Sequence, residues 1–332
     1  MSAYHRPIVQ HGSARPAEAL PVAGGPLWFT HVEILSRQGD PRVVAALDLA
    51  SDIQARLSGT RAPIAGLDMG RPHIMGILNA TPDSFSDGGQ HATVEAARAA
   101  ARQMVAQGVS ILDVGGESTR PGADFVPVET EIARTAPVIS AIAAESDTLI
   151  SIDTRKSEVA AAALDAGAGM VNDVSGFTFD SGLAPLSATR SIPVCVMHAQ
   201  GDPETMQDDP HYDDVLLDVF DFLNNRISHL EAMGVPRGQI VADPGIGFGK
   251  TLDHNLTLLR NIGLFHDLGV PILLGASRKR FIGTIAREPR ADARAPGSIA
   301  VALAALAQGV QIIRVHDVGE TAQALRLWSA VR

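Results

Sequence analysis

The sequence has little cysteine, few aromatic residues and no excess of positive charge. Its single cysteine, Cys195, excludes a disulfide within the chain, and its place in an apolar run at 193–197 predicts a buried, inert side chain. Aromatic residues make up only 4% of the chain, whereas 45% of it is hydrophobic and mostly aliphatic. This composition is typical of many short strands and helices packed in layers, and it therefore indicates an α/β protein.

The deficit of positive charge limits the classes of partner. A formal net charge of −10 argues against nucleic acids and anionic membranes, because both select broad basic surfaces. The sequence has no apolar run of about 18 residues that would predict a membrane-spanning helix, and residues 1–16 lack the apolar core of a secretion signal. We therefore expect a cytoplasmic protein with small-molecule substrates. An anionic substrate is compatible with the net charge, because a few local cations can bind it.

The first 71 residues differ from the rest of the chain. They predict only a break at 24–26, a strand at 27–35 and a short helix at 48–57. We interpret residues 1–71 as an N-terminal extension that packs on the main domain. No residues in this extension have catalytic spacing, so we assign it no function.

From residue 72 to residue 332 the pattern becomes regular. Short apolar runs predict eight strands, at 74–78, 111–112, 149–152, 170–171, 194–197, 240–242, 272–274 and 310–313. Helical patterns follow them at 93–107, 129–144, 157–166, near 183, and at 212–233, 255–267, 298–308 and 320–330. Eight consecutive strand-helix units of this size predict a (β/α)8 TIM barrel. The alternative, a doubly wound open sheet, requires a reversal of strand order that the sequence does not report.

Polar residues follow the predicted strands. Because the carboxyl ends of barrel strands share one mouth, these side chains should meet in one site. The early and middle strands contribute carboxylates and an amide: Asp113, Asp153, Asn172 and Asp243. These acceptors suit a heterocycle with many N–H donors, while an Mg²⁺ site is the rival interpretation. The mixture of amide and acid favours the donor-rich ring.

The last two strands are followed by cations. Lys279 and Arg280 come after the seventh predicted strand, and Arg314 and His316 come after the eighth. The loops at these positions form the usual phosphate pocket of a TIM barrel. In an acidic chain this cluster predicts an anion clamp, so the substrate should combine a donor-rich ring with phosphate. The stretch 243–251 is not a P-loop, because Pro244 stands where that motif requires its first glycine.

Eight motifs, in order, resemble those of the dihydropteroate synthases, a family of pterin-binding enzymes of bacterial folate biosynthesis. They read NATPDSFSDGG (79–89), DVGGESTRPGA (113–123), SIDT (151–154), NDVSG (172–176), MHAQGDP (197–203), DPGIGFGK (243–250), SRKRFIG (277–283) and RVHDV (314–318). The resemblance covers residues 72–332. It implies condensation of 6-hydroxymethyl-7,8-dihydropterin pyrophosphate with p-aminobenzoate, which gives 7,8-dihydropteroate and pyrophosphate.

The resemblance also implies roles for individual residues. The pterin would contact Asp113, Asp153, Asn172, Asp243, Lys279 and Arg314. The p-aminobenzoate would contact Thr119, Arg120, Pro121, Phe85, Phe248 and Ser277, and the pyrophosphate would contact Asn79, Arg314 and His316. Asn79 would also be a ligand of an Mg²⁺ ion bound to that pyrophosphate, and catalysis would depend on Lys279, Arg314, His316 and Asp153. Residues 83–89 and 118–123 would be closing loops, and the C-terminal helices would form a homodimer.

Two other interpretations stay open at this point. A barrel that binds reduced pterin for corrinoid methyl transfer would share the acidic pocket, but it gives no reason for the cations at 277–279 and 314–316. A catalytically silent paralogue would bind a pterin or a protein partner without turnover, and the retained anion-clamp residues argue against it.

Overall fold

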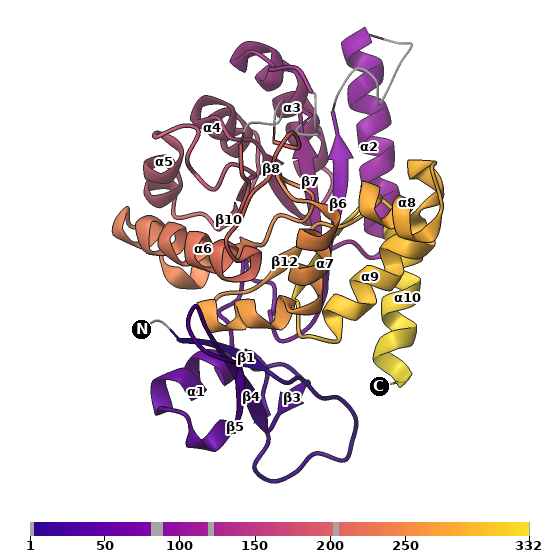
Figure 1. Cartoon of the computed structure of the whole chain (residues 1–332). Helices are drawn as coiled ribbons and strands as arrows, with labels where there is room; N and C mark the ends of the chain where they lie inside the picture. The colour runs from indigo at the N-terminus through magenta and orange to yellow at the C-terminus, as the bar shows by residue number, and fades with distance from the viewer. Residues whose placement is uncertain (1–2, 81–88, 119–122, 202–205, 332) are drawn as a thin grey trace.

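The structure is a computed structural model that describes residues 3–80, 89–118, 123–201 and 206–331. Its main part is a ring of parallel strands surrounded by helices, and a smaller part built from the first residues lies at one end of the ring (Figure 1). The sheet has the strand order β11-β10-β9-β8-β7-β6-β13-β12. A parallel bridge between Ala242 and Ile272 joins the two outer strands and closes the ring. The predicted (β/α)8 barrel is therefore confirmed.

The barrel strands lie close to the predicted apolar runs. They are β6 His73–Asn79, β7 Ile111–Gly115, β8 Leu149–Asp153, β9 Met170–Asp173, β10 Val194–Met197, β11 Ile240–Asp243, β12 Leu273–Leu274 and β13 Ile312–Val315. The last strand begins two residues later than predicted. Gln311 precedes it, with its side-chain Oε1 accepting from the Ile272 backbone N–H at 2.8 Å, and the polar Arg314 lies within it.

The helices of the barrel cover the outside of the ring (Figure 1). They are α2 Gly89–Gln107, α3 Val128–Ala143, α4 Ser157–Asp165, α5 Leu183–Arg190, α6 Val215–Ala232, α7 Leu252–Arg260, α8 Arg280–Ala286, α9 Ala295–Leu306 and α10 Val318–Val331. Two differences from prediction stand out. The helix predicted at 255–267 is divided into α7 and the 3-10 helix η4 Ile262–Leu268, and the short helix α8 was not predicted.

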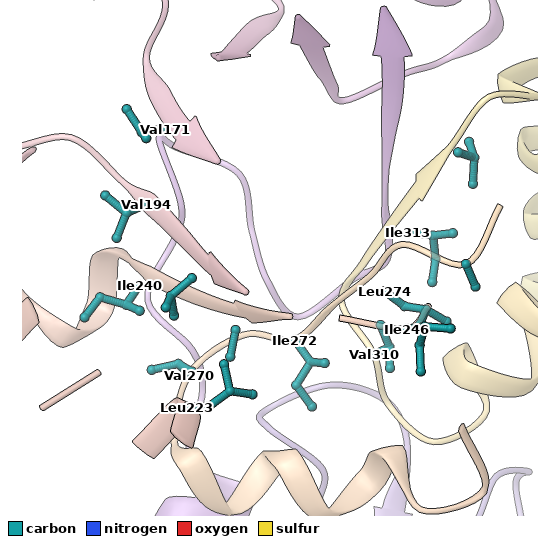
Figure 2. Close-up of a cluster of buried hydrophobic side chains, with 14 of the residues drawn as sticks. Val171, Val194, Leu223, Ile240, Ile246, Val270, Ile272, Leu274, Val310 and Ile313 are labelled. Carbon is teal, nitrogen blue, oxygen red and sulfur yellow. The ribbon is translucent and has the colours of Figure 1, made fainter. Parts of the chain in front are cut away.

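Apolar side chains pack on both faces of the sheet. Outside the ring, strand residues such as Val171, Val194 and Ile240 pack toward the helices (Figure 2). The separate interior cluster contains Met75, Ile111, Met170, Cys195, Val241, Leu273 and Ile312, together with Ile64 and Met69 from the segment before β6. Cys195 is fully buried, as the sequence predicted. The turn formed by Ile64 and Leu67 thus helps to fill the amino-terminal end of the barrel.

Residues 3–60 form a three-stranded sheet, β1-β4-β5, a two-stranded sheet, β2-β3, and a small core of their own. The elements are β1 Ala3–Pro7, β2 Leu20–Pro21, β3 Trp28–Phe29, β4 His31–Ser36, β5 Arg42–Ala45, the 3-10 helix η1 Ala46–Asp48 and α1 Ser51–Ser58. The strand predicted at 27–35 is thus two strands, β3 and β4. These residues contact the barrel at buried Asp267. Its carboxylate accepts hydrogen bonds from the His5 backbone N–H at 2.9 Å and the Arg56 Nε at 2.7 Å.

Candidate active site

The side chains of the candidate site follow from the alternation of a β-strand. Because successive side chains point to opposite faces, a residue two positions beyond an interior apolar residue also points into the barrel, but closer to the carboxyl-terminal mouth. Four predicted site residues stand in this relation to interior residues: Asp113 to Ile111, Asn172 to Met170, Asp243 to Val241, and Arg314 to Ile312. The strand pattern therefore brings these side chains together.

Arg314 lies among the acceptors. Its Nε donates to Asp113 Oδ2 at 2.6 Å, and one of its terminal nitrogens donates to Asp153 Oδ2 at 2.6 Å. Asn172 Nδ2 donates to the same Asp113 oxygen at 3.1 Å. Arg314 was predicted to belong to a cationic group separate from the acceptors, whereas the structure joins the two groups into one network.

Two carboxylate oxygens in this network remain available. The Oδ1 atoms of Asp113 and Asp153 are buried and have no hydrogen-bond partner within the described part of the chain. Asp113 is fully buried, and Asp153 is 8% exposed. Burial raises the pKa of Asp153 to about 7, with a further contribution from Asp113 against the opposing effect of Arg314. Unpaired acceptors of this kind are costly unless a ligand with N–H donors satisfies them.

Asp243 and Lys279 form the adjacent part of the site. Asp243 Oδ1 accepts from the Gly245 backbone N–H at 2.7 Å, and burial raises the pKa of its carboxyl, which Lys279 opposes. The Lys279 ammonium donates to the Ile246 carbonyl and lies 4.3 Å from the centre of the Phe248 ring. Burial lowers the pKa of Lys279 to about 7, although Asp243 raises it. Small changes near this lysine can therefore change its charge at neutral pH.

The loops after β12 and β13 are tied together. His316 Nδ1 lies 3.0 Å from Ser277 Oγ, and the His316 backbone N–H donates to that oxygen at 3.2 Å. Arg278, with a left-handed φ of 59°, turns its guanidinium to Asp317, to which its Nε donates at 3.0 Å. Arg278 is thus committed to holding the loops, whereas Lys279 and Arg314 bring positive charge to the site itself.

Two other residues at strand ends, Asp173 and Asn79, lie outside the hydrogen-bond network of Arg314. Asp173, next to Asn172, accepts from the backbone N–H groups of Ser175 and Phe177 at 2.7 Å each, so it holds a turn. Asn79 ends β6 opposite Gly115 and is half-buried. Across the described ranges, the His, Cys, Asp and Glu side chains form no group of three that could hold a metal.

Ser151 was not among the residues predicted for the site. This residue pairs in register with Asp113, is fully buried, and its Oγ has no hydrogen-bond partner in the described chain. The strand alternation that links it to Asp153 could have identified it. Of the predicted residues, Phe85, Thr119, Arg120 and Pro121 lie outside the described residues, as do most of the two predicted closing loops.

Residues 75–316 match the family described as pterin binding enzymes, and the chain belongs to that family. It is 46% identical over 264 residues to the dihydropteroate synthase of Escherichia coli K12, which covers 80% of this chain and 93% of that protein. A relative from Synechocystis is 45% identical over 261 residues, covering 79% and 90%. Within the family, the chain belongs to the dihydropteroate synthases, as its motifs indicated.

Solved structures agree with this assignment. The dihydropteroate synthase of Xanthomonas albilineans with 4-aminobenzoic acid has a TM-score of 0.77 and 46% identity, covering 82% of this chain and 97% of that one. The Yersinia pestis enzyme in a sulfonamide drug complex has a TM-score of 0.76 and 43% identity, covering 80% and 96%. The methyl-transfer interpretation is therefore set aside. Within the described ranges, no helix has the length and apolarity needed to cross a bilayer.

Proposed function

We propose that this chain condenses 6-hydroxymethyl-7,8-dihydropterin pyrophosphate with p-aminobenzoate to give 7,8-dihydropteroate and pyrophosphate. The observation that carries the proposal is the buried pair of carboxylates in the barrel mouth, each with an oxygen that has no hydrogen-bond partner among the described residues. A reduced pterin presents a guanidine-like edge with several N–H donors. Two carboxylates and an amide match that edge and strengthen its hydrogen bonds through charge.

The guanidinium of Arg314 supports this assignment, because it resembles the proposed ligand. It donates to Asp113 and Asp153 at 2.6 Å each, as the guanidine-like edge of the pterin would. We infer that the pterin takes over these two acceptors, together with Asn172, and that Asp243 and Lys279 contact the rest of the ring. Arg314 would then turn toward the pyrophosphate and stack on the pterin.

The pyrophosphate would be held by Arg314, His316 and Asn79. Asn79 offers one amide oxygen at the end of β6, so its donor set fits Mg²⁺ only as an ion that also takes oxygens from pyrophosphate and water. When bound, Mg²⁺ would neutralise negative charge on the leaving group. Arg314 and His316, in and directly after the neighbouring strand β13, would neutralise that charge as well.

The p-aminobenzoate would lie near Ser277 and Phe248. Ser277 Oγ already contacts His316, and the Phe248 ring lies beneath the Lys279 ammonium, so both residues border the proposed reaction centre. Phe85, Thr119, Arg120 and Pro121 would complete this subsite. The Yersinia pestis relative forms a complex with a sulfonamide drug, and we propose that such drugs compete for the same subsite here.

The chemistry follows from charge. The bond between the pterin methylene carbon and oxygen breaks, and its electron pair leaves with pyrophosphate, while the lone pair of the aryl amine forms the new C–N bond and the amine gives up a proton. Negative charge develops on the leaving group beside Arg314 and His316, and positive charge develops near Asp113 and Asp153. The neutral aryl amine is itself the nucleophile, so the reaction needs no activated nucleophilic side chain of the protein.

Three further assignments remain proposals. We propose that the chain divides near residue 71, that it works in the cytoplasm, and that it forms a homodimer through its C-terminal helices. Leu327 and Val331 of α10 are 66% and 74% exposed, which supports a contact on this face. Sedimentation of the wild type at micromolar concentration tests the dimer, and a monomer would contradict it.

The direct test of the function is an incubation with the pterin pyrophosphate, p-aminobenzoate and Mg²⁺, followed by detection of dihydropteroate. We expect product only when both substrates are present. Folded protein that gives no product would contradict the proposed reaction and favour a silent paralogue.

A further inference from the structure

The chain contains 24 arginines but only three lysines, and each lysine lies in a loop that follows a barrel strand. Lys279 belongs to the proposed site, and Lys156 pairs with Glu131 at 2.6 Å. Lys250 differs from both. It is 3% exposed, and no carboxylate lies within ion-pair distance of its ammonium in the described structure. Burial lowers the pKa of Lys250 well below its usual value, and a buried lysine without a counter-ion is costly, so its role needs an explanation.

Three acceptors surround the Lys250 ammonium. Its Nζ lies 2.8 Å from His198 Nδ1, and it donates to the Phe248 carbonyl at 3.0 Å and the His198 carbonyl at 3.4 Å. Burial, together with Lys250, keeps the pKa of His198 well below its usual value, so the neutral ring can accept through Nδ1. Rings from Phe222 and Tyr212 hold the imidazole, at 4.8 and 5.9 Å between ring centres.

These bonds connect two loops whose backbones already touch. A Cβ on Gly245 would lie 1.8 Å from the His198 carbonyl oxygen, and a Cβ on Gly249 would lie 2.3 Å from the Gln200 carbonyl oxygen. Both glycines have left-handed φ values, of 66° and 61°. Glycine is therefore required at both positions for steric reasons, and the loop after β11 rests directly on the loop after β10.

The loop after β11 forms the support of Lys279. Lys279 donates to the Ile246 carbonyl and lies over the Phe248 ring, so both of these contacts come from this one loop. Lys250 donates to the carbonyl of that same Phe248. Lys250 thus connects the fixed ring of His198 to the residue on which Lys279 rests, without entering the proposed substrate site.

We propose that Lys250 is a positioning residue: its ammonium ties His198 to Phe248 and so fixes the platform that aims Lys279 at the pterin substrate. This inference rests on the proposed function, because its effect is expressed through Lys279. It predicts that Lys250 matters to catalysis only while Lys279 is present.

A double-mutant cycle tests this dependence. Lys250→Met should lower kcat/KM for the pterin pyrophosphate by about tenfold in the wild-type background, but by less than about twofold in the Lys279→Met background. The same substitution at Lys156 is the matched control, because that lysine is equally buried in a different loop. Its loss should be the same in both backgrounds.

A pair of substitutions at the partner gives a second readout if Lys250→Met does not fold. His198→Gln keeps an acceptor for the ammonium and should retain kcat/KM within about threefold, whereas His198→Leu removes the acceptor and should lower it by about tenfold. Equal losses in the Gln and Leu variants would overturn the inference, and so would a cycle in which Lys250→Met and Lys279→Met act additively. A wild type without turnover would overturn the proposed function itself.

Discussion

Removal of Arg314 should make the stability of the fold depend more steeply on pH. In the wild type, Arg314 bridges Asp113 and Asp153, and it opposes the burial that raises the pKa of Asp153 to about 7. Arg314→Met removes the bridging cation and leaves two buried carboxylates beside each other. They can avoid repulsion only by holding a proton, so the folded variant should keep the proton that the folded wild type loses as the pH rises above about 7.

The sign and size of the effect follow from proton linkage. Asp153 has a folded pKa above its unfolded value, so its contribution to stability is present at low pH and lost as the pH rises through about 7. One additional proton in the folded variant adds a slope of about 1.36 kcal/mol per pH unit. Because wild-type Asp153 also holds its proton below pH 7, the stability difference between wild type and variant should grow between pH 7 and pH 9, by up to about 2.7 kcal/mol.

Urea unfolding of both proteins at several pH values measures this difference. Arg190→Met is the matched control, because Arg190 pairs with Asp165 on the surface, where the two side chains are 45% and 63% exposed. An exposed pair of this kind contributes about 0–1 kcal/mol, and its loss should show no added slope. Parallel stability curves for wild type and Arg314→Met between pH 7 and 9 would refute the bridging role of Arg314.

Three other outcomes are expected. The kcat/KM for the pterin pyrophosphate should fall on both sides of pH 7, because Asp153 must be ionised and Lys279 protonated, and each group has a pKa of about 7. Asp153→Asn should abolish the fall of kcat/KM on the acid side. A pH profile that this substitution leaves unchanged would contradict the role of Asp153. Lys279→Met should lower kcat/KM by the equivalent of about 2 to 4 kcal/mol without lowering the melting temperature, and full turnover would remove its assigned role. Asp267→Ala should cost about 2 to 4 kcal/mol of stability, measured by urea unfolding, because it releases His5 and Arg56, while kcat stays unchanged; an unaltered midpoint would show that the N-terminal residues are held elsewhere.

Much of the barrel could be predicted from the sequence because two local signals agree. Short aliphatic runs mark buried parallel strands, and a polar residue where a run stops marks the mouth. The same reasoning misplaces the bounds of a strand when a polar site residue lies inside it. Arg314 interrupts the apolar run of β13, so the strand was predicted two residues too early.

The contacts of the site are harder to predict than its members. Arg314 reaches Asp113 across 201 residues of sequence, and nothing local distinguishes that partner from a bound phosphate. Lys250 is a similar case, because its partner His198 lies 52 residues away on another loop. In both cases the closed barrel determines the partner, because it brings the ends of strands that are distant in sequence within hydrogen-bonding distance.

The most direct test of the central claim is a crystal structure of the wild type with the pterin pyrophosphate bound. We predict that the guanidine-like edge of the pterin occupies the carboxylates of Asp113 and Asp153 and that Arg314 has left them to contact the pyrophosphate. A pterin bound elsewhere, or Arg314 still bridging both carboxylates with the pterin in place, would contradict the account.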